Sequence, residues 1–131
     1  MVPSQNRGTT HRPRVLIVDD DPLIRGVVRA VLEDASYDLD EAADGEEALR
    51  VALKHPPDVV LLDVMMPGLN GFEVAAALKE DRRLKEAVVV MLTAKGSPED
   101  RRRGMEAGAD AYFTKPFSPL ELLTTLSGVL Q

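Results

Sequence analysis

The stretch DVVLLDVMMPGLNGFE, residues 58–73, decides how the rest of this chain is arranged. Its apolar run from Val59 to Leu62 ends on the carboxylate of Asp63. A short, continuous apolar run is typical of a strand that is buried on both faces, as in a parallel sheet. Asp63 is therefore predicted at the carboxyl end of a central strand, and ligands of open α/β sheets bind outside that edge.

The residues after Asp63 predict a turn followed by a new helix. Pro67 and Gly71 are turn formers, and Asn70 precedes Glu73 by three residues, which is the spacing of a capping box. An Asp often follows a strand simply as a turn residue, so Asp63 alone does not indicate a site. The residues that end the other strands decide the question.

The composition is typical of an ordinary soluble globular domain. The chain has 131 residues, of which 44% are hydrophobic and 29% charged. It has no cysteine, which excludes disulfides and thiolate metal sites. The net charge of −6 argues against general nucleic-acid binding, and no apolar run approaches the roughly 20 residues of a membrane span. We therefore expect a cytoplasmic chain that binds neither nucleic acid nor membrane directly.

Strands and helices are predicted to alternate along the chain. Residues 1–12 are polar and basic and are expected to form a disordered N-terminal tail, followed by one domain at 13–131. Strands are predicted at 14–18, 37–42, 59–62, 87–92 and 109–114, the second of them at a half-exposed edge. The alternation of five strands with five helices implies a doubly wound parallel sheet with helices on both faces.

The predicted helices have recognisable starts and apolar faces. Asp21 with Pro22, Ser97 with Pro98 and Ser118 with Pro119 each place a capping residue before a proline. Asp44 and Glu47 form a second expected capping box, for a helix that runs through Lys54, and the helix after Asn70 is expected to reach about residue 82. In the first helix, an apolar stripe recurs at helical spacing: Leu23, Ile24, Val27, Val28, Val31 and Leu32. In the last helix, the residues expected to dock on the sheet are Leu122, Leu123, Leu126, Val129 and Leu130.

Four predicted strands end on polar residues: Asp19 and Asp20, Asp63, Thr93 and Lys115. Because parallel strands end at the same rim, we expect these side chains to lie together. Carboxylates crowded at one rim repel one another unless a cation joins them, and oxygen ligands without His or Cys indicate Mg²⁺. Lys115 offers a point charge for a phosphate oxygen. A carboxylate in such a place can act as a nucleophile in phosphoryl transfer.

With these features the chain resembles the receiver domain of bacterial two-component response regulators over residues 14–130. The resemblance implies a flavodoxin-like fold with strand order 2-1-3-4-5. It also implies a switch rather than an enzyme, with only self-phosphotransfer and autodephosphorylation. The motifs that carry the resemblance are Val18-Asp19-Asp20, DVMMPGLNG from Asp63 to Gly71, Thr93-Ala94, Ala107-Gly108-Ala109 and Lys115-Pro116-Phe117.

The resemblance gives each site residue an expected role in a phosphorelay. Asp63 would accept a phosphoryl group from a sensor histidine kinase or a histidine phosphotransfer protein. Asp20 would bind Mg²⁺ directly and Asp19 largely through water, while the backbone carbonyl of Met65 would complete the metal shell. Lys115 would contact the phosphoryl group.

The same resemblance implies a switch that reaches the surface. Thr93 would turn toward the phosphoryl group, and the ring of Tyr112 would then turn in from solvent. The bond between Lys115 and Pro116 would be cis. The affected surface comprises the helix that begins at Ser97, the strand at 109–114 and the last helix, and its output partner is not identified by the sequence.

Alternatives remain at this stage. A pseudo-receiver would be an interaction module without phosphorylation, although the intact acids, Thr93 and Lys115 argue against it. A phosphohydrolase of the haloacid-dehalogenase type would carry a second acid two residues after the nucleophile, where this chain has Met65. The chain is either a stand-alone regulator, like those of chemotaxis, or the receiver of a longer protein.

The oligomeric state is expected to be a monomer or a weak dimer. Arg101 and Glu121 could form one of the ion pairs that join receivers of the DNA-binding branch. Ala111 and Thr125 stand where an acid and a base are expected for another pair. The run of three arginines at 101–103 is interpreted as a solvated helix face, with a partner contact as the alternative.

Overall fold

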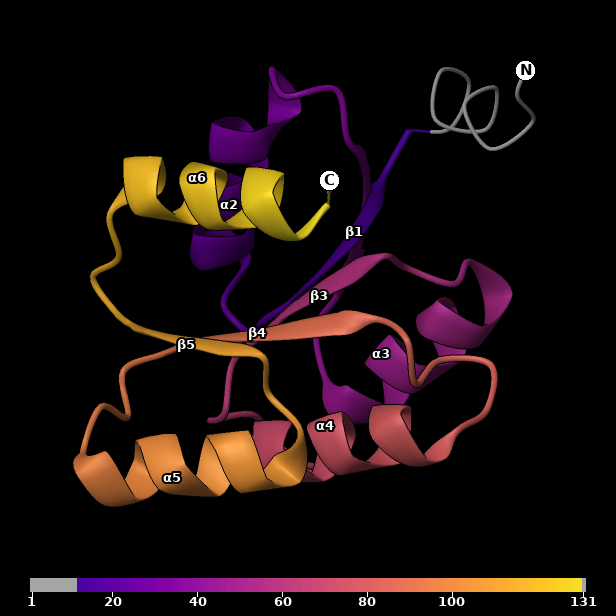
Figure 1. Cartoon of the computed structure of the whole chain (residues 1–131), viewed down its shortest axis with the longest axis vertical. Helices are drawn as coiled ribbons and strands as arrows, with labels where there is room; N and C mark the ends of the chain where they lie inside the picture. The colour runs from indigo at the N-terminus through magenta and orange to yellow at the C-terminus, as the bar shows by residue number, and fades with distance from the viewer. Residues whose placement is uncertain (1–11, 131) are drawn as a thin grey trace.

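Five parallel strands form the central sheet in the described part of the chain, residues 12–130 of a computed structural model (Figure 1). Their order is β2-β1-β3-β4-β5, which confirms the expected topology and places β2 at an edge. The tail predicted at 1–12 lies outside the described residues, apart from Arg12. The strands are β1 (Arg14–Val18), β2 (Asp38–Ala42), β3 (Val59–Leu62), β4 (Val88–Thr93) and β5 (Ala111–Thr114).

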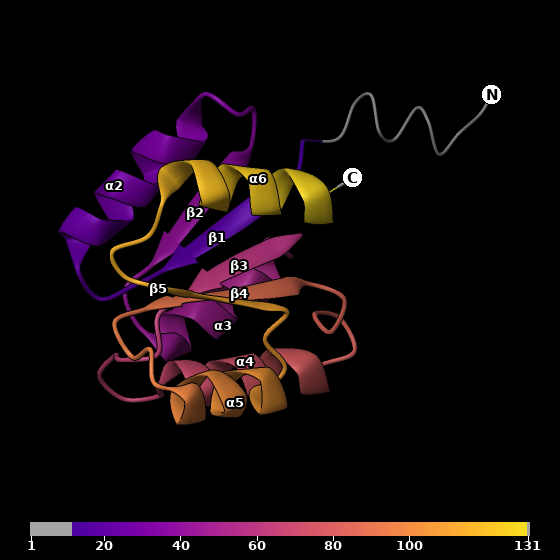
Figure 2. The same cartoon turned by 60° about the vertical axis from the view of Figure 1, so that its left-hand side comes forward.

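Helices cover both faces of this sheet. Figure 2 shows α2 and α6 on one face and α3, α4 and α5 on the other. The helices are α2 (Pro22–Glu33), α3 (Gly45–Lys54), α4 (Gly71–Glu80), α5 (Pro98–Ala107) and α6 (Pro119–Val129). None of the helices within residues 12–130 combines the length and the apolar character needed to cross a bilayer.

The strands are buried because both faces of the sheet are covered. Alternate residues of β3 point into opposite cores: Val60 and Leu62 pack with α3 and α4, while Val59 and Leu61 pack with α2 and α6. All four are at most 1% exposed. Full burial of such a side chain contributes roughly 1.5–3 kcal/mol relative to exposure. The central strand therefore cannot shift its register without moving both cores.

The predicted helix starts are confirmed, with one difference in detail. The side chains of five N-cap residues accept a backbone hydrogen bond from the first turn: Asp21, Asp44, Asn70, Ser97 and Ser118. Asn70 and Glu73 form the reciprocal capping box. At α3 the box is incomplete, because Glu47 Oε1 accepts from Ala43 N at 2.7 Å rather than from Asp44 N. The carboxylate of Glu47 thus secures the residue that precedes the cap.

Some residues of the predicted apolar helix faces are exposed. Leu23 and Val27 of α2 are 77% and 51% exposed, whereas Val28 and Leu32 on the same helix are buried. Val129, expected to dock on the sheet, is 42% exposed. Helical spacing predicted an apolar stripe wider than the strip that the sheet covers, so the side chains at its margin remain in solvent.

Element boundaries differ from the prediction by one or two residues. β5 begins at Ala111 rather than at 109, because Ala109 N donates to Gly104 O at 2.9 Å and completes the end of α5. Gly108, the predicted stop of that helix, has φ +116° and bonds back to Met105 O. α4 ends at Glu80 rather than near 82, where the backbone of Asp81 becomes extended.

Candidate functional site

Four strand ends meet at one rim of the sheet, as the parallel topology requires. Hydrogen bonds continue one residue past the strands: Asp63 N donates to Val18 O at 3.0 Å, and Lys115 N donates to Thr93 O at 2.8 Å. Asp19 N donates to the end of β2 in the same way, at 3.2 Å. The backbones of these three residues are therefore held by the neighbouring strand ends. This fixes the direction of their side chains more firmly than a free loop would.

The rim gathers three carboxylates around one ammonium. Carboxylate oxygens of Asp19, Asp20 and Asp63 all lie within 4.8 Å of one another. Asp19 and Asp63 are buried, at 4% and 6% exposure, while Asp20 is exposed. Lys115 Nζ donates to Asp19 Oδ2 at 2.7 Å and to Asp63 Oδ2 at 3.1 Å. The predicted convergence of these four residues is confirmed.

The surroundings change the proton affinities of two of these groups. Burial raises the pKa of the Asp19 carboxyl above its ordinary value, and the negative charge of Asp63 raises it further. The hydrogen bonds from Lys115 and from Asp21 N lower this pKa, but by less. Burial opposes the charge of Lys115, but its hydrogen bond to Asp19 and the charges of both acids outweigh this, so the pKa of Lys115 is raised. Lys115 therefore stays charged and holds the two buried carboxylates together.

The loop after β3 packs closely against Asp63. Gly71 N donates to Val64 O at 2.9 Å, and a Cβ at Gly71 would lie 2.3 Å from the carbonyl oxygen of Asp63. Only glycine fits such a close approach. Met65 N donates to Asp63 Oδ1 at 3.2 Å, and Met65 is 56% exposed. The loop thus fixes one carboxylate oxygen of Asp63 and leaves the other facing Lys115.

Thr93 and Tyr112 are joined through the backbone of Lys95. Thr93 is fully buried, and its Oγ1 accepts from Lys95 N at 3.3 Å. The hydroxyl of Tyr112 donates to the carbonyl of Lys95, so the half-buried ring already points inward in this structure. Burial raises the pKa of the Tyr112 phenol. The Lys115–Pro116 bond is cis, as expected.

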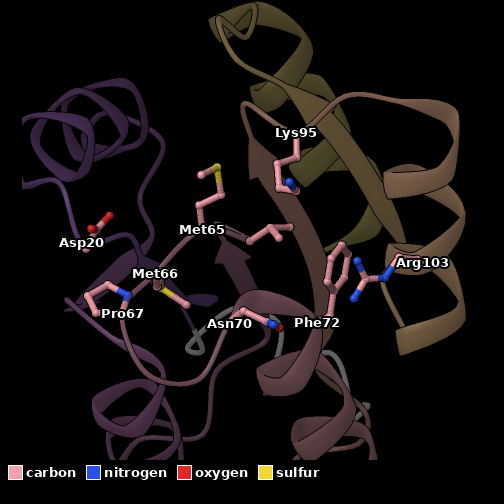
Figure 3. Close-up of a pocket in the computed structure, with 9 residues that line it drawn as sticks. Asp20, Met65, Met66, Pro67, Asn70, Phe72, Lys95 and Arg103 are labelled. Atoms are coloured by element: carbon pink, nitrogen blue, oxygen red, sulfur yellow. The ribbon is translucent and has the colours of Figure 1, made fainter.

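A pocket of about 510 Å³ opens beside the carboxylates (Figure 3). Asp20 and Met65 line one side of it, and Phe72, Lys95 and Arg103 the other. The guanidinium carbon of Arg103 lies 4.4 Å from the centroid of the Phe72 ring.

Of the residues that line this pocket, Lys95 could have been assigned to the rim from the sequence, because it lies two residues after the strand end at Thr93. Arg103 could not, because nothing local shows that its helix face turns toward Phe72.

Comparisons with known proteins agree with this architecture. The family model described as "Response regulator receiver domain" matches residues 15–127. Among curated relatives, the phosphate regulon transcriptional regulatory protein PhoB of Pseudomonas aeruginosa is 44% identical over 117 residues, which are 89% of this chain and 51% of PhoB. The DNA-binding dual master transcriptional regulator RpaA of Synechocystis sp. is 42% identical over 119 residues, covering 91% of this chain and 49% of RpaA.

A solved structure extends the similarity to three dimensions. Chemotaxis protein CheY4 of Vibrio cholerae matches with a TM-score of 0.85 at 42% sequence identity. The match covers 91% of this chain and 99% of the CheY4 chain. The chain therefore corresponds to nearly all of one relative, whereas it spans about half the length of the curated regulators it matches.

Proposed function

The chain belongs to the receiver domain family of two-component response regulators, and on that premise we propose that it is a phosphorylation-controlled switch. In this proposal Asp63 takes a phosphoryl group from a sensor histidine kinase or a histidine phosphotransfer protein. The observation that carries the proposal is the rim cluster: Asp63 lies beside two further carboxylates and 3.1 Å from the Lys115 ammonium. Aspartates that serve only as turn residues do not require this arrangement.

The proposed transfer follows from the groups around Asp63. A carboxylate oxygen attacks phosphorus while the phosphorus–nitrogen bond of the donor phosphoimidazole breaks, which gives an acyl phosphate. The imidazole, protonated on its other nitrogen, leaves in the neutral form. In this proposal Lys115 contacts a phosphoryl oxygen, and Thr93, which ends a neighbouring strand, donates its hydroxyl to another. Positioning and charge neutralisation would carry most of the barrier reduction.

The acid cluster fits Mg²⁺ by its donor set. Asp19, Asp20 and Asp63 offer oxygen ligands only, and one ammonium leaves an excess of negative charge that a divalent cation would balance. When bound, the cation stabilises negative charge on the carboxylates and on the incoming phosphoryl group. Met65 is proposed to contribute its backbone carbonyl, which agrees with a side chain that is exposed and of no ligand type.

The family consists of signalling switches, and we assign no catalytic turnover of a separate substrate to this chain. The proposed output surface is formed by α5, β5 and α6. PhoB and RpaA are transcriptional regulators by name, which makes transcription the output we propose for a regulator that contains this domain. A pseudo-receiver is disfavoured because Asp19, Asp63 and Lys115 are all present and in contact.

Phosphorylation by a small donor tests the proposal. The parent chain, incubated with acetyl phosphate and Mg²⁺, is expected to gain one phosphoryl group by intact-mass spectrometry. Asp63→Asn is expected to gain none, because the nucleophilic oxygen is lost. Asp20→Asn should be labelled far more slowly and should bind Mg²⁺ many-fold more weakly in titrations, because a charged oxygen leaves the cluster.

The matched control is Asp21→Asn. Asp21 neighbours the cluster in sequence, but its side chain caps α2 by accepting from Leu23 N at 2.9 Å, which asparagine can also do. This variant should be labelled like the parent. Full labelling of Asp63→Asn would rule out Asp63 as the sole acceptor, and a parent chain that stays unlabelled would favour the pseudo-receiver.

A further inference from the structure

Gly104 leaves a gap in α5 that the ring of Tyr112 fills. Gly104 is buried within the helix, where glycine is less favourable than alanine. A Cβ at this position would lie 2.8 Å from both Cδ2 and Cε2 of Tyr112, and 3.0 Å from Met91 Sδ. Carbon atoms normally pack at about 3.5–4.0 Å, so a side chain at 104 would force the inward ring to shift.

The Tyr112 ring in this gap is hydrogen-bonded to Lys95, which in turn is hydrogen-bonded to Thr93 at the rim of the sheet. The Tyr112 hydroxyl donates to the carbonyl of Lys95, whose N–H donates to Thr93 Oγ1. On α5, the guanidinium carbon of Arg101 lies 5.3 Å from the ring centroid, and Arg101 also bonds Thr114 Oγ1 at 2.8 Å. The inward ring thus links the loop after β4 to α5 and β5. Its removal from the gap would break the hydrogen bond to Lys95.

We propose that Gly104 is the residue that determines how readily Tyr112 lies inward. With no side chain at 104, the inward orientation is available before any phosphoryl group is bound, as the structure has it. Both orientations then exist in equilibrium, and a side chain at 104 shifts that equilibrium toward the outward ring. The proposal deepens the switch of the proposed function, but the step from residue 104 to the ring does not depend on phosphorylation.

Fluorotyrosine labelling makes the ring directly visible. The chain has two tyrosines, Tyr37 and Tyr112, so Tyr37→Phe leaves a single fluorine signal. In that background, Gly104→Ala is expected to move the Tyr112 signal toward the position of a solvent-exposed tyrosine, without any phosphodonor. The pKa of the Tyr112 phenol should fall toward its ordinary value in the same variant, because burial is the largest of the effects that raise it.

The matched control is Gly26→Ala in α2. Gly26 is also a helical glycine, but a Cβ there meets nothing within 4 Å. This variant should raise the melting temperature, because alanine favours the helix, and should leave the Tyr112 signal unchanged. An unchanged Tyr112 signal in folded Gly104→Ala would overturn the proposal.

If Gly104→Ala folds poorly, the proposal can still be tested by making the same substitution in a chain that lacks the Tyr112 ring and comparing melting temperatures. In a Tyr112→Ala chain the ring is absent and Met91 Sδ, at 3.0 Å, still crowds position 104, so Gly104→Ala should lower the melting temperature less than it does with the ring in place. If Gly104→Ala lowers the melting temperature equally with and without the ring, the clash lies elsewhere and the proposal is wrong. If the ring responds to residue 104 while Asp63 takes up no phosphoryl group, the steric proposal stands and the proposed function fails.

Discussion

Lys115 holds two buried carboxylates together at the rim. Its ammonium lies 2.7 Å from Asp19 and 3.1 Å from Asp63, and its side chain is 19% exposed. Removing one member of a buried ionic group leaves charges without a partner, which costs several kcal/mol when burial is complete. Because solvent reaches part of this site, the loss should be smaller than for complete burial.

Lys115→Met is therefore expected to lower the free energy of unfolding by about 1–3 kcal/mol in chelator, measured by urea denaturation. Added Mg²⁺ should recover part of this loss, because the cation takes over the charge compensation. Lys95→Met is the control, since Lys95 lies at the same rim but forms no ion pair within residues 12–130. Equal effects of the two variants would contradict the bridging role of Lys115.

The location of a single residue in the fold was predictable where it follows directly from the residue's position at the end of a strand. Asp63 and Lys115 each follow a strand, and parallel strands end together, so their proximity could be inferred before the structure was known. Gly104 could not be singled out, because the reason for it lies in the Tyr112 ring, which belongs to another element. A sequence records which residues are small, but not what occupies the space beside them.

At the scale of elements, an ionic contact ties α2 to the edge strand β2. Glu41 accepts from Arg29 Nε at 2.6 Å and from Arg25 Nε at 3.0 Å. The hydrogen bond from Arg29 is the main cause of a lowered pKa for the Glu41 carboxyl, with Arg25 adding to it against burial. Arg25 also donates to Asp19 O at 2.7 Å, so the contact supports the rim as well.

The sign of the resulting pH dependence follows from linkage. An acid whose pKa is lower in the folded state stabilises the fold above its unfolded pKa, and this stability is lost as the pH falls through the folded pKa. Glu41→Gln should thus cost about 0.5–1 kcal/mol near neutral pH, since the side chain is partly exposed, and progressively less below the ordinary glutamate pKa of 4.5. Urea denaturation at several pH values measures this. Exposed Glu80→Gln is the control, and a Glu41→Gln effect that does not shrink in acid would refute the assignment.

The helices and strands could be predicted where the sequence features that define them lie within a few residues of one another. Caps, prolines and alternation are read within a few residues, which is why all five helix starts are confirmed. The exposure of Leu23 and Val27 is not a local property, because it depends on how far the sheet extends beneath α2. The start of β5, two residues later than predicted, is not a local property either. It depends on the hydrogen bond that Ala109 N donates to Gly104 O of α5.

For the whole molecule, the alternation of strands and helices established a parallel sheet but not the order of its strands. That order, confirmed as β2-β1-β3-β4-β5, was inferred from the family resemblance. Local periodicity shows that each strand is buried, whereas strand order depends on which neighbours share a core. The order matters for function, because it places β3 with Asp63 next to both β1 and β4.

This arrangement gives a short route from the rim to the surface of α5, β5 and α6. Thr93 lies beneath the rim, and Lys95 connects its hydroxyl to the ring of Tyr112. Phosphorylation would add acceptor oxygens above Thr93. If the hydroxyl turned toward them, its contact with Lys95 N would weaken, and the loop that receives the Tyr112 hydroxyl would move. Both states should exist beforehand, with the phosphoryl group changing their populations.

Thr93→Ala should consequently be phosphorylated yet switch poorly, because the acceptor remains while the responding hydroxyl is absent. In amide spectra recorded with and without beryllofluoride as a phosphoryl mimic, the parent should show changes at Asp63 and also at Tyr112 and along α5. In Thr93→Ala the changes near Asp63 should persist, and those at α5 should shrink several-fold. Thr93→Ser keeps the hydroxyl and should respond like the parent. If the parent's changes never extend beyond the rim, or if Thr93→Ala transmits them fully, the route through Thr93 and Lys95 is not the one the protein uses.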